Sequence, residues 1–260
     1  MTISTPSNNL YKKLQKQYSR KINLDLKRIN FALKKLGNIH ESIRNPINII
    51  GSDGKYSTLK SLQYFIQKNK EKVSTFTSPH LYDVRHRFWL KNKFIGINEL
   101  KKNIKVIKKL KIKLTLFEVL TLVYYIAASK LKNISYSLCE SGLLFKGDST
   151  RVWSSPKCQI VTNINKQHME WVKPKTLREI CRQKVGYLSN NTTIYVGKQK
   201  PKTMKIIKEI LNKNPSKKNF YGNAWSLKKK GNKRIYKDKK GKIVLKSNRI
   251  FSEGIWQNVG

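Results

Sequence analysis

The stretch Pro46-Ile47-Asn48-Ile49-Ile50-Gly51-Ser52-Asp53-Gly54-Lys55-Tyr56-Ser57-Thr58 decides the fold class of this chain. Its first five residues form an apolar run typical of a buried strand, and residues 59–66 repeat apolar side chains at helical spacing. A strand, a glycine-containing loop and a helix in this order are the geometry of a phosphate-binding loop. Glycines permit the tight turn, and the helix N-terminus offers free N–H groups to an anion. We therefore prefer nucleotide binding to the alternative, a plain surface turn.

The loop predicts a particular division of labour among its side chains. Lys55 would reach the outer phosphates of a nucleotide, and Ser57 or Thr58 could hold a magnesium ion. The loop departs from the standard form because one residue separates the lysine from the serine. The predicted ATP site consists of Gly51, Ser52, Asp53, Gly54, Lys55, Tyr56, Ser57 and Thr58.

Composition limits the class of protein. A length of 260 residues suits one large domain, or a domain with a small appendage, and 38% hydrophobic residues support a packed core. The three cysteines are scattered singly, which argues against a disulfide scaffold or a zinc cluster and predicts a reducing, cytoplasmic location. The N-terminus lacks the apolar core of a signal peptide. The longest apolar run, residues 116–128, is interrupted by Glu118 and is too short to span a bilayer, so no membrane partner is expected.

The net charge of +42 allows two interpretations. One is a surface that binds nucleic acid, since neutralisation of phosphates by Lys and Arg dominates such affinity. The other is coding bias, because lysine, isoleucine and asparagine are the residues of A/T-rich codons. We prefer coding bias, since the lysines are spread along the chain and no nucleic-acid-binding motif is recognised. Non-specific adhesion to nucleic acid at low salt is still expected.

Apolar runs of strand length alternate with helical segments from residue 46 onward, which predicts an α/β fold with a mainly parallel sheet and helices on both faces. After Pro215, short alternating runs predict a small antiparallel meander at about 219–246. Three segments are expected: a helical lead-in (1–45), an ATP-binding domain (46–250) and a linker to a further domain (251–260). The predicted strands are 47–50, 73–76, 134–139, 159–164 and 193–196, and the predicted helices are 58–68, 97–110, 116–128, 174–184 and 201–211.

Distinctive residue blocks follow the predicted strands, at the ends where ligands gather in parallel sheets. They are Ser78-Pro79-His80-Leu81, Glu140-Ser141-Gly142-Leu143, a block ending in His168, and Lys184-Val185-Gly186. Together with the phosphate loop and in this order, these blocks resemble the folylpolyglutamate synthase and dihydrofolate synthase family of the Mur ligase superfamily. The resemblance covers nearly the whole chain from about residue 20.

The resemblance implies an ATP-dependent amide ligase that joins L-glutamate to dihydropteroate or a folate. In that family ATP phosphorylates the carboxylate of the pterin substrate, and the glutamate amine attacks the acyl phosphate. Such chemistry depends on neutralising charge around the γ-phosphate, which implies Mg²⁺ beside positively charged side chains.

Matching positions carry roles over by resemblance. Lys184 matches a lysine that is carbamylated in the family, and Glu118, inside an apolar helix, is expected to be a hydrogen-bonded structural acid. The catalytic set is Lys55, His168 and Lys184, the Mg²⁺ ligands are Ser78, Glu140 and His168, and the substrate contacts are Ser78, Pro79, His80 and Arg87.

The chain also departs from the family pattern. Asp53 and Tyr56 stand where the loop usually carries asparagine and glycine, and Gln167 stands where an aspartate precedes the histidine. Family members continue into a second domain, so we expect a truncated or split ligase whose missing half a separate chain could supply. Catalysis by this chain alone is not expected. Two alternatives are open: a non-catalytic relative that acts as a basic nucleic-acid-adhesive module, and a Mur ligase for a peptidoglycan precursor, which the Ser78–Leu81 block disfavours.

Overall fold

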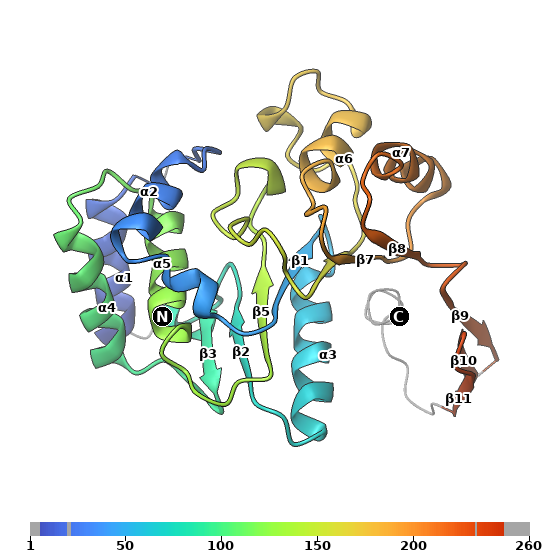
Figure 1. Ribbon diagram of the computed structural model, residues 1–260, viewed down its shortest axis with the longest axis horizontal. Helices are drawn as coiled ribbons and strands as arrows, with labels where there is room; N and C mark the ends of the chain where they lie inside the picture. The colour runs from blue at the N-terminus through green and yellow to red at the C-terminus, as the bar shows by residue number, and fades with distance from the viewer. Residues whose placement is uncertain (1–5, 20–21, 232, 247–260) are drawn as a thin grey trace. The chain divides into compact units, whose positions relative to one another are not determined.

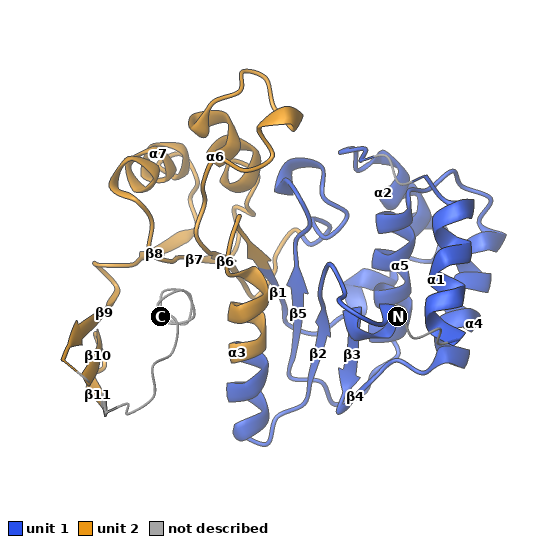
Figure 2. Cartoon of the chain, turned by 180° about the vertical axis from the view of Figure 1, so that it is seen from behind, with its two compact units in different colours: residues 1–48, 62–153 blue, residues 49–61, 154–260 orange. Residues whose placement is uncertain are grey.

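The computed structural model describes residues 6–19, 22–231 and 233–246, and Figure 1 shows the order of its elements. The chain forms two compact units, residues 1–48 with 62–153 and residues 49–61 with 154–260 (Figure 2). The linker predicted at 251–260 lies outside the described residues. Within the described ranges, no helix is long and apolar enough to cross a membrane.

The first unit is built around helix α5 (Leu116–Ala128), which is buried along almost its whole length. Helices α4 (Ile97–Lys109) and α2 (Lys27–Lys35) pack against it, and these helices lie grouped with α1 (Pro6–Gln17) in Figure 1. The shared core is apolar, which gives these elements their main stabilisation. The remaining elements of this unit are the strands β2 (Val73–Phe76), β3 (Phe88–Lys91), β4 (Lys93–Phe94) and β5 (Tyr136–Glu140) and the 3₁₀ helices η1 (Ile39–Ser42), η2 (Val84–Arg87) and η3 (Phe145–Gly147).

The second unit holds the elements that follow residue 153. Strands β6, β7 and β8 pair in parallel order, and helix α7 connects β7 to β8. Strands β9, β10 and β11 form a separate antiparallel sheet. Their bounds are β6 (Cys158–Val161), η4 (Met169–Trp171), α6 (Leu177–Val185), β7 (Thr193–Val196), α7 (Pro201–Leu211), β8 (Lys217–Phe220), β9 (Trp225–Lys230), β10 (Lys233–Asp238) and β11 (Lys242–Lys246).

The strand order of the large sheet is β4-β3-β2-β5-β1-β6-β7-β8. Strand β1 (Pro46–Ile50) contributes its first residues to one unit and its last to the other, as does helix α3 (Lys55–Lys68). Pairing is parallel between β2 and β5 and from β6 to β8, and antiparallel from β2 through β3 to β4. The predicted class, a mainly parallel sheet with helices and a small antiparallel sheet near the C-terminus, is confirmed.

The structure differs from the sequence expectation at both edges of the large sheet. Strand β8 (Lys217–Phe220) pairs in parallel with β7, so the antiparallel sheet begins at Trp225 and not at residue 219. The physical reason is helix α7, which carries the chain back across the sheet so that the next strand runs parallel. Strands β3 and β4 and helix α1 were not expected, because β3 and β4 are short and α1 has a largely polar sequence.

Candidate functional site

The phosphate loop joins the end of β1 to the start of α3. Gly54 has a φ of 80°, the left-handed region that glycine adopts without strain, and α3 begins at the next residue. Gly51 serves close packing, because a Cβ there would lie 2.0 Å from the Thr162 hydroxyl oxygen and 3.1 Å from the Asn163 carbonyl oxygen. The free N–H groups of the first turn of α3 therefore follow directly after a tight turn, as an anion site requires.

Backbone hydrogen bonds hold this loop against the segment that follows β6. The Ser52 and Asp53 amides donate to the Asn163 carbonyl oxygen at 2.7 and 3.3 Å. In return the Asn165 amide donates to the Ser52 hydroxyl oxygen at 3.2 Å. The loop conformation is thus set by residues more than 100 positions away in the sequence.

Two lysines converge on the loop backbone. The Lys55 ammonium group donates to the carbonyl oxygens of Gly51 and Ser52 at 3.3 and 3.2 Å. Lys184, on α6, is 1% exposed, and its Nζ donates to the same Gly51 carbonyl oxygen at 2.8 Å. A buried ammonium group is costly unless it is hydrogen-bonded, so the loop conformation and the Lys184 side chain support one another. The two cations give the helix N-terminus the charge that phosphates need.

His168 lies in the electrostatic field of both lysines. Burial lowers the pKa of this imidazole, the nearby Lys184 and Lys55 cations lower it further, and the Glu170 carboxylate opposes them. Its Nδ1 lies 3.8 Å from a Glu170 carboxylate oxygen. The lowered pKa favours the neutral imidazole at neutral pH, the form that can accept a proton or bind a metal ion. The structure thus groups Lys55, His168 and Lys184 within one unit.

Asp53 meets the segment that carries His168. Its carboxylate accepts hydrogen bonds from the Gln167 side-chain amide at 2.9 Å and from the Asn165 side-chain amide. Asp53 and Gln167, two of the departures noted in the sequence, are therefore in direct contact. Sequence reasoning missed Asn165, although its place directly after a predicted strand was a usable signal.

The remaining predicted site residues belong to the other unit. The Ser78 backbone amide donates to a Glu140 carboxylate oxygen at 3.0 Å, and the Glu140 side chain is buried. The Arg87 guanidinium, also buried, donates from Nε to His80 Nδ1 at 2.8 Å. Burial, and then the Arg87 charge, lower the pKa of His80 to about 4, so this histidine is neutral at neutral pH and uses Nδ1 as an acceptor. The Tyr11 ring packs edge-on against His80, a contact that the sequence did not indicate.

The chemistry of these groups fits Mg²⁺ at Ser78 and Glu140. Mg²⁺ prefers oxygen ligands, and a serine hydroxyl with a buried carboxylate at the end of β5 offers them. Across the described part of the chain, no group of three or more His, Cys, Asp or Glu side chains could hold a metal ion. A magnesium site here would therefore depend on hydroxyl and phosphate oxygens for its remaining ligands.

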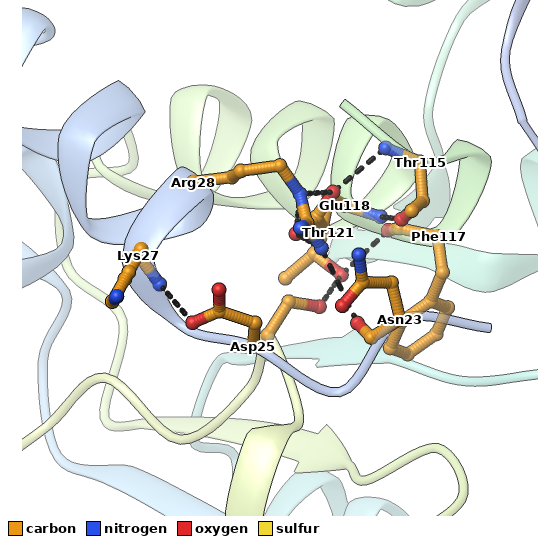
Figure 3. A network of polar contacts seen from close by, with 9 residues as sticks. Asn23, Asp25, Lys27, Arg28, Thr115, Phe117, Glu118 and Thr121 are labelled. Carbon is orange, nitrogen blue, oxygen red and sulfur yellow. Dashed lines mark hydrogen bonds and ion pairs between the residues drawn. The ribbon is translucent and has the colours of Figure 1, made fainter. Parts of the chain in front are cut away.

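Glu118 has the structural role that the sequence predicts (Figure 3). It is 3% exposed and accepts two hydrogen bonds from Arg28 Nε at 3.1 and 3.2 Å and one from Nη2 at 2.9 Å. It also completes a capping box with Thr115 at the start of α5, accepting from the Thr115 amide at 2.7 Å. The acid thus joins α2 to α5 and caps α5, and these contacts explain its burial.

Known proteins share both the sequence and the fold of this chain. No protein-family model matches it. The dihydrofolate synthase/folylpolyglutamate synthase of Bacillus subtilis is 24% identical over 191 residues, which is 70% of this chain and 44% of the relative. The dihydrofolate synthetase of Saccharomyces cerevisiae is 30% identical over 199 residues, 72% of this chain and 45% of the relative.

Solved structures agree with these relatives. Escherichia coli FolC in complex with DHPP and ADP superposes with a TM-score of 0.84 at 20% identity, over 98% of this chain and 61% of that one. A Yersinia pestis folylpolyglutamate synthase/dihydrofolate synthase complexed with AMPPNP and Mn ion gives 0.80 at 20% identity, over 92% and 57%. The chain spans less than half the length of the curated relatives that it matches. It therefore belongs to the folylpolyglutamate synthase/dihydrofolate synthase family and matches the N-terminal portion of these proteins.

Proposed function

We propose that this chain is the nucleotide-binding part of an ATP-dependent ligase of folate metabolism, which adds L-glutamate to dihydropteroate or a folate. The observation that carries the proposal is the convergence of Lys55 and Lys184 on the Gly51 carbonyl oxygen, at the N-terminus of α3. This arrangement supplies positive charge and free N–H groups where a triphosphate would lie. The relatives named as folate synthases support the choice of substrates.

Each site residue receives a role under this proposal. The loop backbone and Lys55 bind and orient the phosphates of ATP, and Lys184 supports the loop from beneath, where carbamylation would change its charge. Ser78, Glu140 and His168 would hold Mg²⁺, which neutralises phosphate charge when it is bound. His80, kept neutral, and Arg87 would face the pterin substrate or its carboxylate. A cytoplasmic location is part of the proposal, supported by three free cysteine thiols.

Calorimetric titration of Mg-ATP into wild type and Lys55→Ala tests the proposal. We expect saturable binding by wild type and loss of at least about tenfold in affinity in the variant, because a charge-assisted contact to phosphate is removed. Lys60→Ala, on the same helix and over the Tyr56 ring, is the matched control and should bind normally. Equal affinity of wild type and Lys55→Ala would remove the assignment of the loop.

A second candidate function is a basic nucleic-acid-binding module that does not catalyse ligation. The observation that favours it is the strand segment 225–246, which carries ten Lys or Arg residues and a single acid. This sheet also borders a cavity of about 670 Å³ lined by Tyr221, Trp225, Lys237 and Lys242 among others. Aromatic rings beside cations suit stacking of bases and contact with phosphates.

A further inference from the structure

The phosphate loop carries an acid in a place where an acid would repel phosphates. Asp53 lies two residues before the start of α3, beside the ammonium groups that the loop collects. Its carboxylate oxygens accept from separate donors, one from the Gln167 side-chain amide at 2.9 Å and the other from the Asn165 side-chain amide. Both donors come from the short segment between β6 and His168.

The choice of residue types suits this contact. A carboxylate accepts hydrogen bonds at both oxygens and donates none, whereas an asparagine at the same place would present an N–H group to one of the two donors. The backbone bonds from Ser52 and Asp53 to the Asn163 carbonyl oxygen already hold the start of this segment. The Asp53 side chain therefore extends the attachment from Asn163 to Gln167, the residue next to His168.

We propose that Asp53 is a positioning residue of the nucleotide site: its carboxylate, held by the side-chain amides of Asn165 and Gln167, ties the phosphate loop to the segment that carries His168. The attachment keeps His168 in the field of Lys55 and Lys184. The part of the proposal that concerns nucleotide rests on the proposed function, and the attachment itself does not.

A charge exchange tests this role. Asp53→Asn places an amide against two amides, and Gln167→Glu places a carboxylate against a carboxylate, so each single variant breaks the contact. The double variant Asp53→Asn/Gln167→Glu restores one donor and one acceptor and keeps the net charge of wild type. Glu99→Gln, an exposed acid on α4, changes the net charge as Asp53→Asn does and is the matched control.

Calorimetry with Mg-ATP separates positioning from simple repulsion. We expect each single variant to bind about fivefold more weakly, because one hydrogen bond to a charged group is lost, and the double variant to recover within about twofold of wild type. If Asp53 acted only through its charge, Asp53→Asn would instead bind the anionic nucleotide more tightly. Unchanged or tighter binding by Asp53→Asn would overturn the positioning role.

Amide hydrogen exchange, followed by mass spectrometry without nucleotide, tests the attachment itself. We expect faster exchange in residues 163–168 for both single variants, protection restored in the double variant, and no change for Glu99→Gln. Unchanged exchange in both single variants would overturn the proposal even if ATP binds. If wild type bound no ATP, the proposed function would fail, and the exchange pattern would still decide whether Asp53 ties the two segments together.

Discussion

Gly51 illustrates how single residues build the phosphate loop. The sequence marks it as a turn residue, yet the structure shows that its main constraint is space, since Thr162 and Asn163 from β6 and its following loop leave no room for a Cβ. The Thr162 hydroxyl also donates to the Ile50 carbonyl oxygen at 3.2 Å, so it cannot move aside without losing that bond. The loop thus depends on a close approach of two segments as well as on turn geometry.

Gly51→Ala is expected to lower the free energy of unfolding by roughly 1–3 kcal/mol, because the added methyl group overpacks this contact. Weaker Mg-ATP binding should accompany the change, since the loop must shift. Urea denaturation and calorimetry measure the two effects. Gly96→Ala is the control, because a Cβ there meets nothing within 4 Å. Equal stability of the two variants would show that Thr162 adapts without cost.

At the scale of elements, helix α1 anchors the loop that bears His80. The Ser7 hydroxyl on α1 donates to a carboxylate oxygen of Asp83 at 2.7 Å, and Arg85 donates to the same carboxylate from its side chain and its backbone. Burial by itself would raise the pKa of Asp83, but these hydrogen bonds outweigh it and lower the pKa to about 2. The ordinary value is 3.8, so the ionised carboxylate stabilises the fold.

Asp83→Asn should lower the free energy of unfolding by about 2 kcal/mol at pH 7. Since the folded-state pKa of Asp83 is depressed, its contribution is present above about pH 4 and is lost as the pH falls toward 2. The difference between wild type and Asp83→Asn should therefore shrink over that window when unfolding is measured with denaturant at several pH values. Glu71→Gln, at an exposed position, should show no such loss. A difference that does not change with pH would contradict the role of the ionised carboxylate.

At the scale of the whole molecule, the net charge of +42 is the dominant property. Coding bias would spread its effect over every surface, whereas a dedicated nucleic-acid site would concentrate it. The segment 225–246 holds ten of the 56 Lys and Arg residues in 22 positions, about twice the average density of the chain. The local density and the aromatic cavity beside it make this segment the place to test.

Binding of a single-stranded oligonucleotide, measured by fluorescence anisotropy, should weaken about tenfold or more between 50 and 200 mM salt. Lys55→Ala should not alter it. If the segment is a dedicated site, Lys237→Gln/Lys242→Gln should reduce the slope of log affinity against log salt by about two, while Lys101→Gln/Lys105→Gln on α4 should leave it unchanged. Equal effects of both pairs would favour coding bias.

Much of the fold could be predicted because the local pattern and the tertiary environment agree. Strand β1 and helices α5 and α7 have nearly the predicted bounds, since each has a continuous apolar pattern between clear start and stop signals. Strand β8 could not be assigned to the large sheet, because its sequence Lys217-Lys218-Asn219-Phe220 carries little apolar signal. Its pairing depends on β7 beside it, which no local pattern reports.

The sequence by itself determined the α/β class, the phosphate loop, the structural role of Glu118 and the family. Each of these depends on residue types at short spacing or on an ordered series of blocks. Only the tertiary structure decided that Lys184 donates to Gly51, and that Asp53 meets a residue 114 positions away. A hydrogen bond between distant segments leaves no periodicity in the sequence, because it forms only when the strand order brings two loops to the same edge of a sheet.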